Sequence, residues 1–76
     1  MTEKEWKEFV KQVLKREFRK KKITYPKLIE KLKDIGVHES LFSIKNKISR
    51  GSFNAVFFMQ CLKAIDCKTV RIRDKE

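Results

Sequence analysis

Between Ser40 and Gly51 the sequence concentrates side chains that can hydrogen-bond nucleic acid. They are Ser43, Asn46, Lys47, Ser49 and Arg50. Asparagine pairs with adenine, arginine and lysine pair with guanine, and serine contacts either kind of base. The apolar residues of the same stretch recur at helical spacing, as Leu41, Ile44 and Ile48. The pattern predicts a helix over residues 40–50, capped by Ser40, with an apolar inner face and a polar outer face.

Phe42 is the aromatic residue of this predicted helix. It falls near the start of the helix, on the side that the polar residues share. Two interpretations stand: the ring contacts the methyl group of a thymine, or it completes the core. The core interpretation is the one we favour.

A second predicted helix, over residues 24–35, precedes the first. Thr24 fits an N-cap and Pro26 is tolerated in the first turn. Its apolar stripe consists of Leu28, Ile29, Leu32 and Ile35. Gly36 matches the left-handed position that ends a helix, and Val37 is expected to plug the turn into the core. The pair reads as a helix-turn-helix, with Thr24 and Tyr25 at the positive end of the earlier helix, where phosphate would bind.

A long amphipathic helix is predicted over residues 3–21, with Thr2 and Glu5 as a capping box. Its apolar side consists of Trp6, Phe9, Val10, Val13, Leu14 and Phe18, and its basic residues, Lys7, Lys11, Lys15, Arg19 and Lys22, fall largely elsewhere. Residues 15–22 form a basic run. Lys20, Lys21 and Lys22 within it are either a solvated face or phosphate contacts.

A fourth helix is predicted over residues 54–66, and a tail over 68–76. The inward stripe of the helix is expected to hold Ala55, Phe58, Cys61, Leu62 and Ile65. Further apolar residues exceed what one packed face needs, and they either cover the first helix or mediate self-association. Residues 68–73 alternate apolar and basic side chains, which indicates either a short strand paired between two chains or an irregular packed tail. The candidates for a dimer contact are Val56, Phe57, Met59, Val70 and Ile72.

Bulk properties favour one all-α domain, residues 1–76, of four to five helices with at most a short C-terminal strand. The chain has 76 residues and a formal net charge of +10. Such a positive field attracts polyanions, of which nucleic acid is the commonest. No apolar run approaches the roughly 18 residues of a membrane span, and the N-terminus has no secretory signal pattern. A cytoplasmic protein with no membrane contact is expected.

The residue types needed for catalysis or metal binding are scarce. Cys61 and Cys67 are the only cysteines and His38 is the only histidine, so the usual zinc ligand set cannot be assembled within one chain. No glycine-rich phosphate loop, nucleophile–base pair or carboxylate pair is present. We expect no enzymatic activity, no catalytic or metal-binding residues, no cofactor and no small-molecule substrate.

Residues 8–67 resemble the lambda-repressor-like (Cro or Xre-type) helix-turn-helix class. The family pattern Leu-Thr-Gln-x-x-Leu-Ala is similar to residues 23–29, ITYPKLI, and its Glu-Arg-Gly to residues 49–51, SRG. Departures are Ile29 for a small alanine, Tyr25 for a phosphate-gripping glutamine, and about three extra residues before Gly36. The phrases ITYPKL, NKISRG and FNAVFFMQCLKAI are more closely similar to a short bacterial family of unknown function. Both resemblances imply a helical DNA-binding domain.

The favoured hypothesis is a sequence-specific double-stranded DNA-binding protein, a small bacterial transcriptional regulator acting as a homodimer. Its predicted DNA contacts are Thr24, Tyr25, Ser40, Ser43, Asn46, Lys47, Ser49, Arg50, Ser52, Lys20, Lys21 and Lys22. One alternative is a basic RNA- or ribosome-associated protein. Another is an antitoxin-like adaptor that contacts a protein through Val56, Phe57 and Met59.

Overall fold

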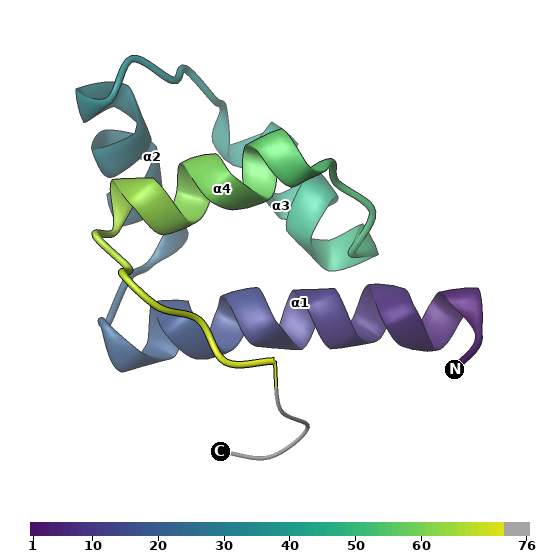
Figure 1. Cartoon of the computed structure of the whole chain (residues 1–76). Helices are drawn as coiled ribbons and strands as arrows, with labels where there is room; N and C mark the ends of the chain where they lie inside the picture. The colour runs from purple at the N-terminus through teal and green to yellow at the C-terminus, as the bar shows by residue number, and fades with distance from the viewer. Residues whose placement is uncertain (73–76) are drawn as a thin grey trace.

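A computed structural model describes residues 1–72, which form four α-helices and no strand (Figure 1). The helices are α1 (Glu3–Lys20), α2 (Tyr25–Asp34), α3 (Leu41–Arg50) and α4 (Ala55–Ala64). The expected all-α class is therefore confirmed. Each helix begins and ends within two residues of the bounds predicted from the sequence.

Every helix begins at a polar cap, because the first backbone N–H groups of a helix have no partner within it. The Thr2 hydroxyl accepts from the Glu5 N–H, and the Glu5 carboxylate accepts from the Thr2 N–H, so the expected capping box is present. The later helices are capped in the same way by Thr24, Ser40 and Asn54. The start of each helix is thus determined by residues close to it in the sequence.

Three helices end in the same reversal, in which the chain turns through one left-handed residue. The left-handed residues are Lys22 (φ 56°) after α1, Gly36 (φ 81°) after α2 and Asp66 (φ 58°) after α4. In each case the next N–H reaches back into the last turn, as Val37 does to the Leu32 carbonyl at 2.9 Å. Glycine adopts this conformation without strain, whereas lysine and aspartate do so at a cost.

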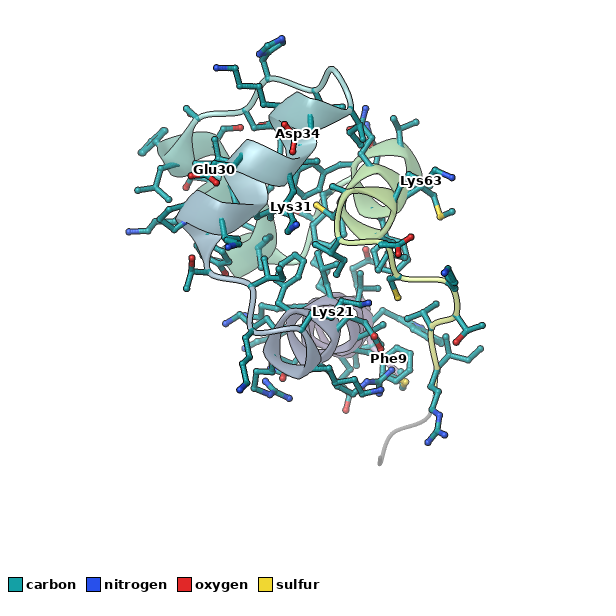
Figure 2. The ribbon with its side chains drawn as sticks, turned by 90° about the vertical axis from the view of Figure 1, so that its left-hand side faces the viewer. Phe9, Lys21, Glu30, Lys31, Asp34 and Lys63 are labelled. Carbon is teal, nitrogen blue, oxygen red and sulfur yellow. The ribbon has the colours of Figure 1, made fainter. Side chains whose placement is uncertain are left out.

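The core lies between α1 on one side and the other three helices on the other. Helix α2 packs on α3 and α4, and α1 contacts α3 and α4. The core side chains are Leu14, Phe18, Leu28, Leu32, Ile44, Ile48, Phe57, Cys61, Leu62 and Ile65. In Figures 1 and 2, α3 lies on the opposite side of the molecule from α4 and the tail. The outer face of α3 and the outer face of α4 therefore point in different directions.

Several apolar residues lie elsewhere than the periodicity predicts. The exposed ones are Trp6, Ile35, Leu41, Phe42 and Ala55, and Phe42 is exposed to 78%. The core interpretation of Phe42 is therefore wrong. Phe57, predicted either to cover the first helix or to mediate self-association, is only 3% exposed. The buried stripe of α4 runs through Phe57, Cys61 and Ile65, because α2 packs on that side of the helix and Lys47 of α3 lies over the Phe57 ring.

The tail after α4 is irregular as far as residue 72, which confirms the irregular-tail interpretation of residues 68–73 for the described part. Pairing of this segment between two chains stays a prediction. Residues 73–76 of the predicted tail lie outside the described part of the chain. The tail packs back along α1: Val70 contacts the core cluster, and the Arg16 guanidinium donates to the Arg71 carbonyl. Arg16 and Glu17 are buried beneath this segment, 7% and 4% exposed. Hydrogen bonds from side chains to the backbone hold the tail in place, without the backbone pairing of a β-strand.

Candidate nucleic-acid interface

Helix α3 presents an outer face that combines polar, basic and aromatic side chains. We define the α3 outer face as Phe42, Lys45, Asn46, Ser49 and Arg50. All except the half-buried Asn46 are exposed. Ile44 and Ile48, both at 0% exposure, anchor the opposite side of the helix to the core. The expected division of this helix into an apolar inner side and a polar outer side is confirmed, apart from Leu41.

Two of the predicted contact residues, Ser43 and Lys47, are engaged within the protein. The Ser43 hydroxyl donates to Glu39 Oε1 at 2.8 Å, and Lys47 Nζ lies 2.9 Å from Glu39 Oε2. The same ammonium group lies 4.7 Å from the centre of the Phe57 ring, a cation–π contact. The structure therefore turns both side chains from the α3 outer face toward α4. Contact of Ser43 or Lys47 with DNA stays a prediction and would have to compete with these bonds.

Glu39 is the acidic centre of this cluster. Its burial would raise the pKa of the carboxyl group, but hydrogen bonds from Lys47 and Ser43, together with the charge of Lys47, lower that pKa below its usual value. The carboxylate is thus held ionised inside a basic protein. Its negative charge also neutralises Lys47 locally, which leaves Lys45 and Arg50 as the cations of α3 that face solvent.

A row of basic residues follows one side of α1. Lys7, Lys11, Lys15 and Arg19 recur four positions apart, so they lie near one another on the helix surface, and Lys22 follows just beyond the end of the helix. We call these five residues the α1 basic row; its helical part, from Lys7 to Arg19, extends over roughly 18 Å at 1.5 Å per residue. Lys11 Nζ donates to the Ser49 carbonyl of α3 at 3.1 Å, and Gly51 abuts the backbone of Lys7. The row therefore adjoins the C-terminal end of α3.

The far end of the row opens into a hollow at the start of α2. The hollow has a volume of about 440 Å³, and its lining includes Lys15, Arg19, Lys22, Thr24 and Tyr25. Burial raises the pKa of the Tyr25 hydroxyl, so this group stays protonated at neutral pH and can donate a hydrogen bond. The positive end of the α2 dipole points into the same region. Three cations, a hydroxyl donor and a helix N-terminus are arranged here to suit an oxyanion.

Of the remaining predicted contact residues, some lie at this hollow and others lie elsewhere on the surface. Lys22 lines the hollow, whereas Lys21 Nζ donates to the Asp66 carbonyl at 3.3 Å and Lys20 Nζ lies 3.7 Å from Glu17 Oε2. The basic run is therefore split across two sides of α1. The Ser40 hydroxyl accepts from the Ser43 N–H as the cap of α3, and Ser52 is exposed beyond its end.

The predicted contacts leave out six cations of this region. Lys7, Lys11, Lys15 and Arg19 belong to the α1 basic row, Lys45 belongs to the α3 outer face, and Lys27 follows Tyr25 in the first turn of α2. The spacing of Lys7, Lys11 and Lys15 at every fourth position is a signal that could have found the row. Lys47 is engaged by Glu39, whereas Lys45 is left exposed. Glu39 lies outside α3, so helical periodicity alone does not predict this difference.

The outer side of α4 is apolar. Val56 and Met59 are 63% and 60% exposed. They border a hollow whose lining includes Ile35, Val37 and Lys63. Lys63 is the only charged residue of the helix. Of the other dimer candidates, Phe57 is buried, Val70 is half-buried and Ile72 is exposed, so Phe57 cannot contribute to a surface contact.

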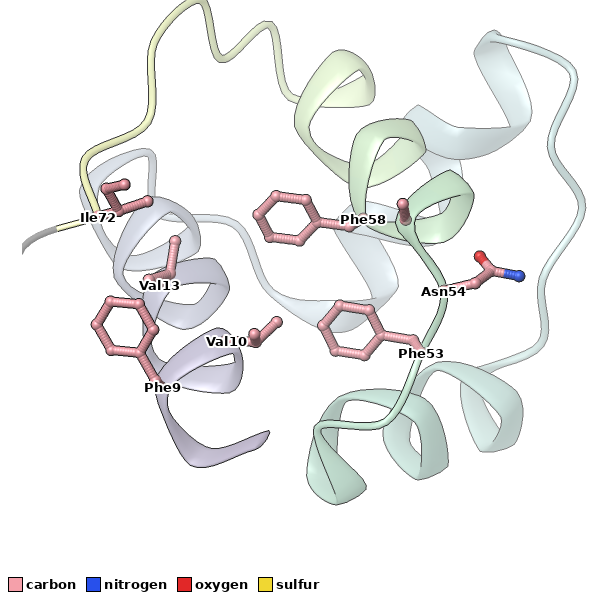
Figure 3. A pocket seen from close by; sticks show the side chains of 8 residues that line it. Phe9, Val10, Val13, Phe53, Asn54, Phe58 and Ile72 are labelled. Atoms are coloured by element: carbon pink, nitrogen blue, oxygen red, sulfur yellow. The ribbon is translucent and has the colours of Figure 1, made fainter. Parts of the chain in front are cut away.

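A second apolar cavity, of about 320 Å³, lies between α1, α4 and the tail. Figure 3 shows Phe9 and Val13 of α1 with Ile72 on one side of it, and Phe53 and Phe58 on the other. The rings of Phe53 and Phe58 are stacked with centroids 6.2 Å apart. Asn54 also borders the cavity, but its amide oxygen accepts from the Phe57 N–H as the cap of α4. The cavity has no charged lining residue.

Both thiols are reduced. Burial raises the pKa of Cys61 to about 12, and the nearby Glu39 carboxylate acts in the same direction. Burial likewise raises the pKa of the half-buried Cys67, aided by Glu17. Within residues 1–72, no cluster of three histidine, cysteine or acidic side chains is placed to hold a metal ion.

Comparison with known proteins places the chain in a family. The family model described as a domain of unknown function, DUF6471, matches residues 6–70. The chain belongs to the DUF6471 family. The DUF6471 match includes the α1 basic row, the α3 outer face and α4. It agrees with the resemblance to a short family of unknown function, but it carries no assignment to the lambda-repressor-like class.

No curated protein and no solved structure matches this DUF6471 chain. Among residues 1–72, none of the helices is both long enough and apolar enough to cross a membrane.

Proposed function

We propose that this DUF6471 domain binds double-stranded DNA as a small bacterial transcriptional regulator. In this proposal α2 and α3 act as a helix-turn-helix of the lambda-repressor-like kind, with the α3 outer face in the major groove. Asn46, Ser49 and Arg50 contact base edges or flanking phosphates, and Lys45 joins them. Ser43 and Lys47 position α3 from within.

The observation that carries the proposal is the continuity between the α1 basic row and the α3 outer face. Lys11 joins the two directly, through its bond to the Ser49 carbonyl. A duplex in contact with α3 would pass its phosphate backbone over the row and the hollow at Thr24 and Tyr25. The row spans several phosphates of one strand. These contacts would supply affinity, and the α3 outer face would supply sequence preference.

The segment between the two helices is longer than in a typical helix-turn-helix. Residues 35–40 join α2 to α3, where three or four residues are usual. The extra length lies in the turn, since α2 itself has only 10 residues. Glu39 lies in this segment and binds two α3 side chains. The longer turn thus provides a residue that fixes the rotation of α3.

Self-association through α4 would complete the proposal. A small module binds weakly alone, and a two-fold dimer on a pseudo-palindrome doubles its contacts. Val56 and Met59 are the residues on which we place this contact. Since α3 lies on the other side of the molecule, both copies of the α3 outer face would stay accessible.

The proposal is tested by titrating a random-sequence duplex with the protein at several salt concentrations. We expect affinity to fall steeply with salt, because bound lysines and arginines release counterions from the duplex. Replacing Lys15 and Arg19 with glutamine should flatten the slope of log K against log salt by roughly 0.9 per lost phosphate contact. Arg50→Gln should also weaken binding.

A matched control removes the same charge elsewhere. Lys68 and Arg71 are exposed on the tail, and their double glutamine variant should bind nearly as the parent protein does. Equal weakening by both double variants would mean that net charge alone drives the interaction. Absence of binding to any duplex at low salt would refute the proposal.

RNA is the second candidate ligand, and one observation favours it. Phe42 and Trp6 are both exposed, whereas the sequence pattern placed Trp6 in an apolar stripe and favoured the core for Phe42. Exposed rings are what readers of single-stranded RNA use for base stacking. Competition between a duplex and a structured RNA of equal length decides between the two ligands.

A further inference from the structure

Phe42 is the most exposed large apolar side chain among residues 1–72, at 78%. It occupies the second position of α3. Its ring takes part in none of the aromatic or cation–π contacts found in this part of the chain. Folding therefore does not account for an aromatic residue here.

The neighbours of Phe42 on the helix surface are polar or basic. Lys45 and Asn46 follow three and four positions later, one turn along, and Ser49 follows at seven. Residues at these spacings share one face of a helix. The ring thus stands at the leading end of the α3 outer face, and Ile44 and Ile48 hold the reverse side of the helix in the core.

The dimensions of a duplex determine what this ring would meet. An α-helix with its side chains is about 10–12 Å across, which suits the major groove, about 12 Å wide. In an intact duplex the base faces are stacked on one another, so only base edges are open to the groove. The one apolar group that those edges present is the 5-methyl group of thymine.

Asn46 favours the same type of base pair, A·T. Asparagine bonds to N6 and N7 of adenine through its two-pronged amide. Asn46 lies roughly 6 Å along the helix axis from Phe42, close to two base-pair steps. No hydrogen bond within residues 1–72 occupies its amide group. Phe42, the apolar side chain of the α3 outer face, and Asn46, its amide side chain, therefore both suit contact with an A·T pair.

We infer that this domain selects duplex sites containing A·T pairs at their centre, with the Phe42 ring packed against a thymine methyl group and the Asn46 amide bonded to a nearby adenine. The inference rests on the proposed function and adds the base preference of the same face. Lys45 and Arg50 would then contact flanking positions.

The test compares two duplexes that differ only in methyl groups. One is an alternating A·T duplex, and the other has deoxyuridine in place of every thymidine, which leaves hydrogen bonding and phosphate charge unchanged. We expect the parent protein to bind the deoxyuridine duplex about fourfold more weakly for each methyl group contacted. Phe42→Ala should bind both duplexes equally, with an affinity near that of the parent protein for deoxyuridine.

Two further variants separate the contributions. Trp6→Ala removes an exposed aromatic ring of α1 that lies outside the α3 outer face, so it should keep the parent ratio between the two duplexes. Asn46→Ala should keep that ratio too, but it should weaken the preference of the parent protein for the A·T duplex over a G·C duplex of equal length, leaving the part that the methyl contact supplies. Thermal unfolding of each variant checks that the fold is intact.

The outcomes distinguish the inference from the proposal beneath it. Equal binding of the thymidine and deoxyuridine duplexes by the parent protein overturns the inference and leaves DNA binding standing. A ratio that persists in Phe42→Ala also overturns it, because the methyl groups would then act through DNA shape. Failure to bind any duplex overturns both.

Discussion

Lys47 on α3 is bound to Glu39 in the preceding turn, with Nζ and Oε2 2.9 Å apart. The Lys47 side chain is 38% exposed and that of Glu39 is 14% exposed, so the pair sits at the edge of the core. Lys45, two positions earlier, faces solvent. One helix therefore carries a lysine that supports the fold and a lysine available to a ligand.

The two lysines should separate stability from binding. Lys47→Met would leave the half-buried Glu39 carboxylate without its partner, and we expect it to lower the free energy of unfolding by about 1 kcal/mol. Lys45→Met should change that free energy by less than about 0.5 kcal/mol and should weaken duplex binding. Urea denaturation and duplex titration of both variants check this pairing. The reverse assignment of effects would place Lys47 in the interface.

Acid should destabilise the protein partly through Glu39. The pKa of Glu39 is lower in the folded chain than its usual value of 4.5, so the folded state binds this proton less readily than the unfolded state. The resulting stabilisation is complete well above pH 4.5 and is lost as the pH falls through the lower folded pKa. Glu39→Gln should show a weaker dependence of unfolding free energy on pH in this range. Parallel pH profiles for both proteins would contradict the assignment.

The two glycines should differ in their tolerance of a methyl group. Gly36 and Gly51 both have positive φ, but a Cβ at Gly36 meets nothing within 4 Å, whereas a Cβ at Gly51 would collide with the Lys7 carbonyl. Gly36→Ala should cost only the left-handed strain, about 1 kcal/mol. Gly51→Ala adds displacement of α1 and should cost about 3 kcal/mol in total. Melting temperatures of the two variants test the order, and equal losses would show that α1 yields freely.

The two thiols should react at different rates. The Cys61 side chain is fully buried and its pKa is about 12, so almost no thiolate is present at pH 8. Cys67 is half-buried beside Glu17 and should react with iodoacetamide first, though more slowly than a free cysteine. Mass spectrometry of peptides over time measures both. Labelling of Cys61 at the rate of Cys67 would indicate that α4 opens readily.

The helix boundaries could be predicted because their causes are local. Thr24, Ser40 and Asn54 each bond to an N–H three residues later, and Gly36 and Gly51 take the left-handed conformation. Each of these interactions involves residues that are only a few positions apart in the sequence. The partners can therefore be recognised from the sequence without knowing the fold.

The orientation of α4 and the composition of the site depended on distant residues. Phe57 is buried because α2 packs on its side of α4 and Lys47 of α3 lies over its ring, whereas Ala55 is exposed. Lys47 was assigned to DNA from its residue type, but Glu39 draws it aside. Helical periodicity gives the width of an apolar stripe, whereas its direction is decided by the neighbours that pack against it.

The bond between Arg16 and the Arg71 carbonyl has a consequence for synthesis on the ribosome. Arg16 belongs to the first helix to emerge, and this partner lies 55 residues later in the chain. Cys67, which donates to Glu17, is 50 residues away from it. While the chain is being synthesised, these partners in the tail reach Arg16 and Glu17 only after α4 has been translated. The contacts between the tail and α1 therefore become possible only after the segment that follows α4 has been synthesised.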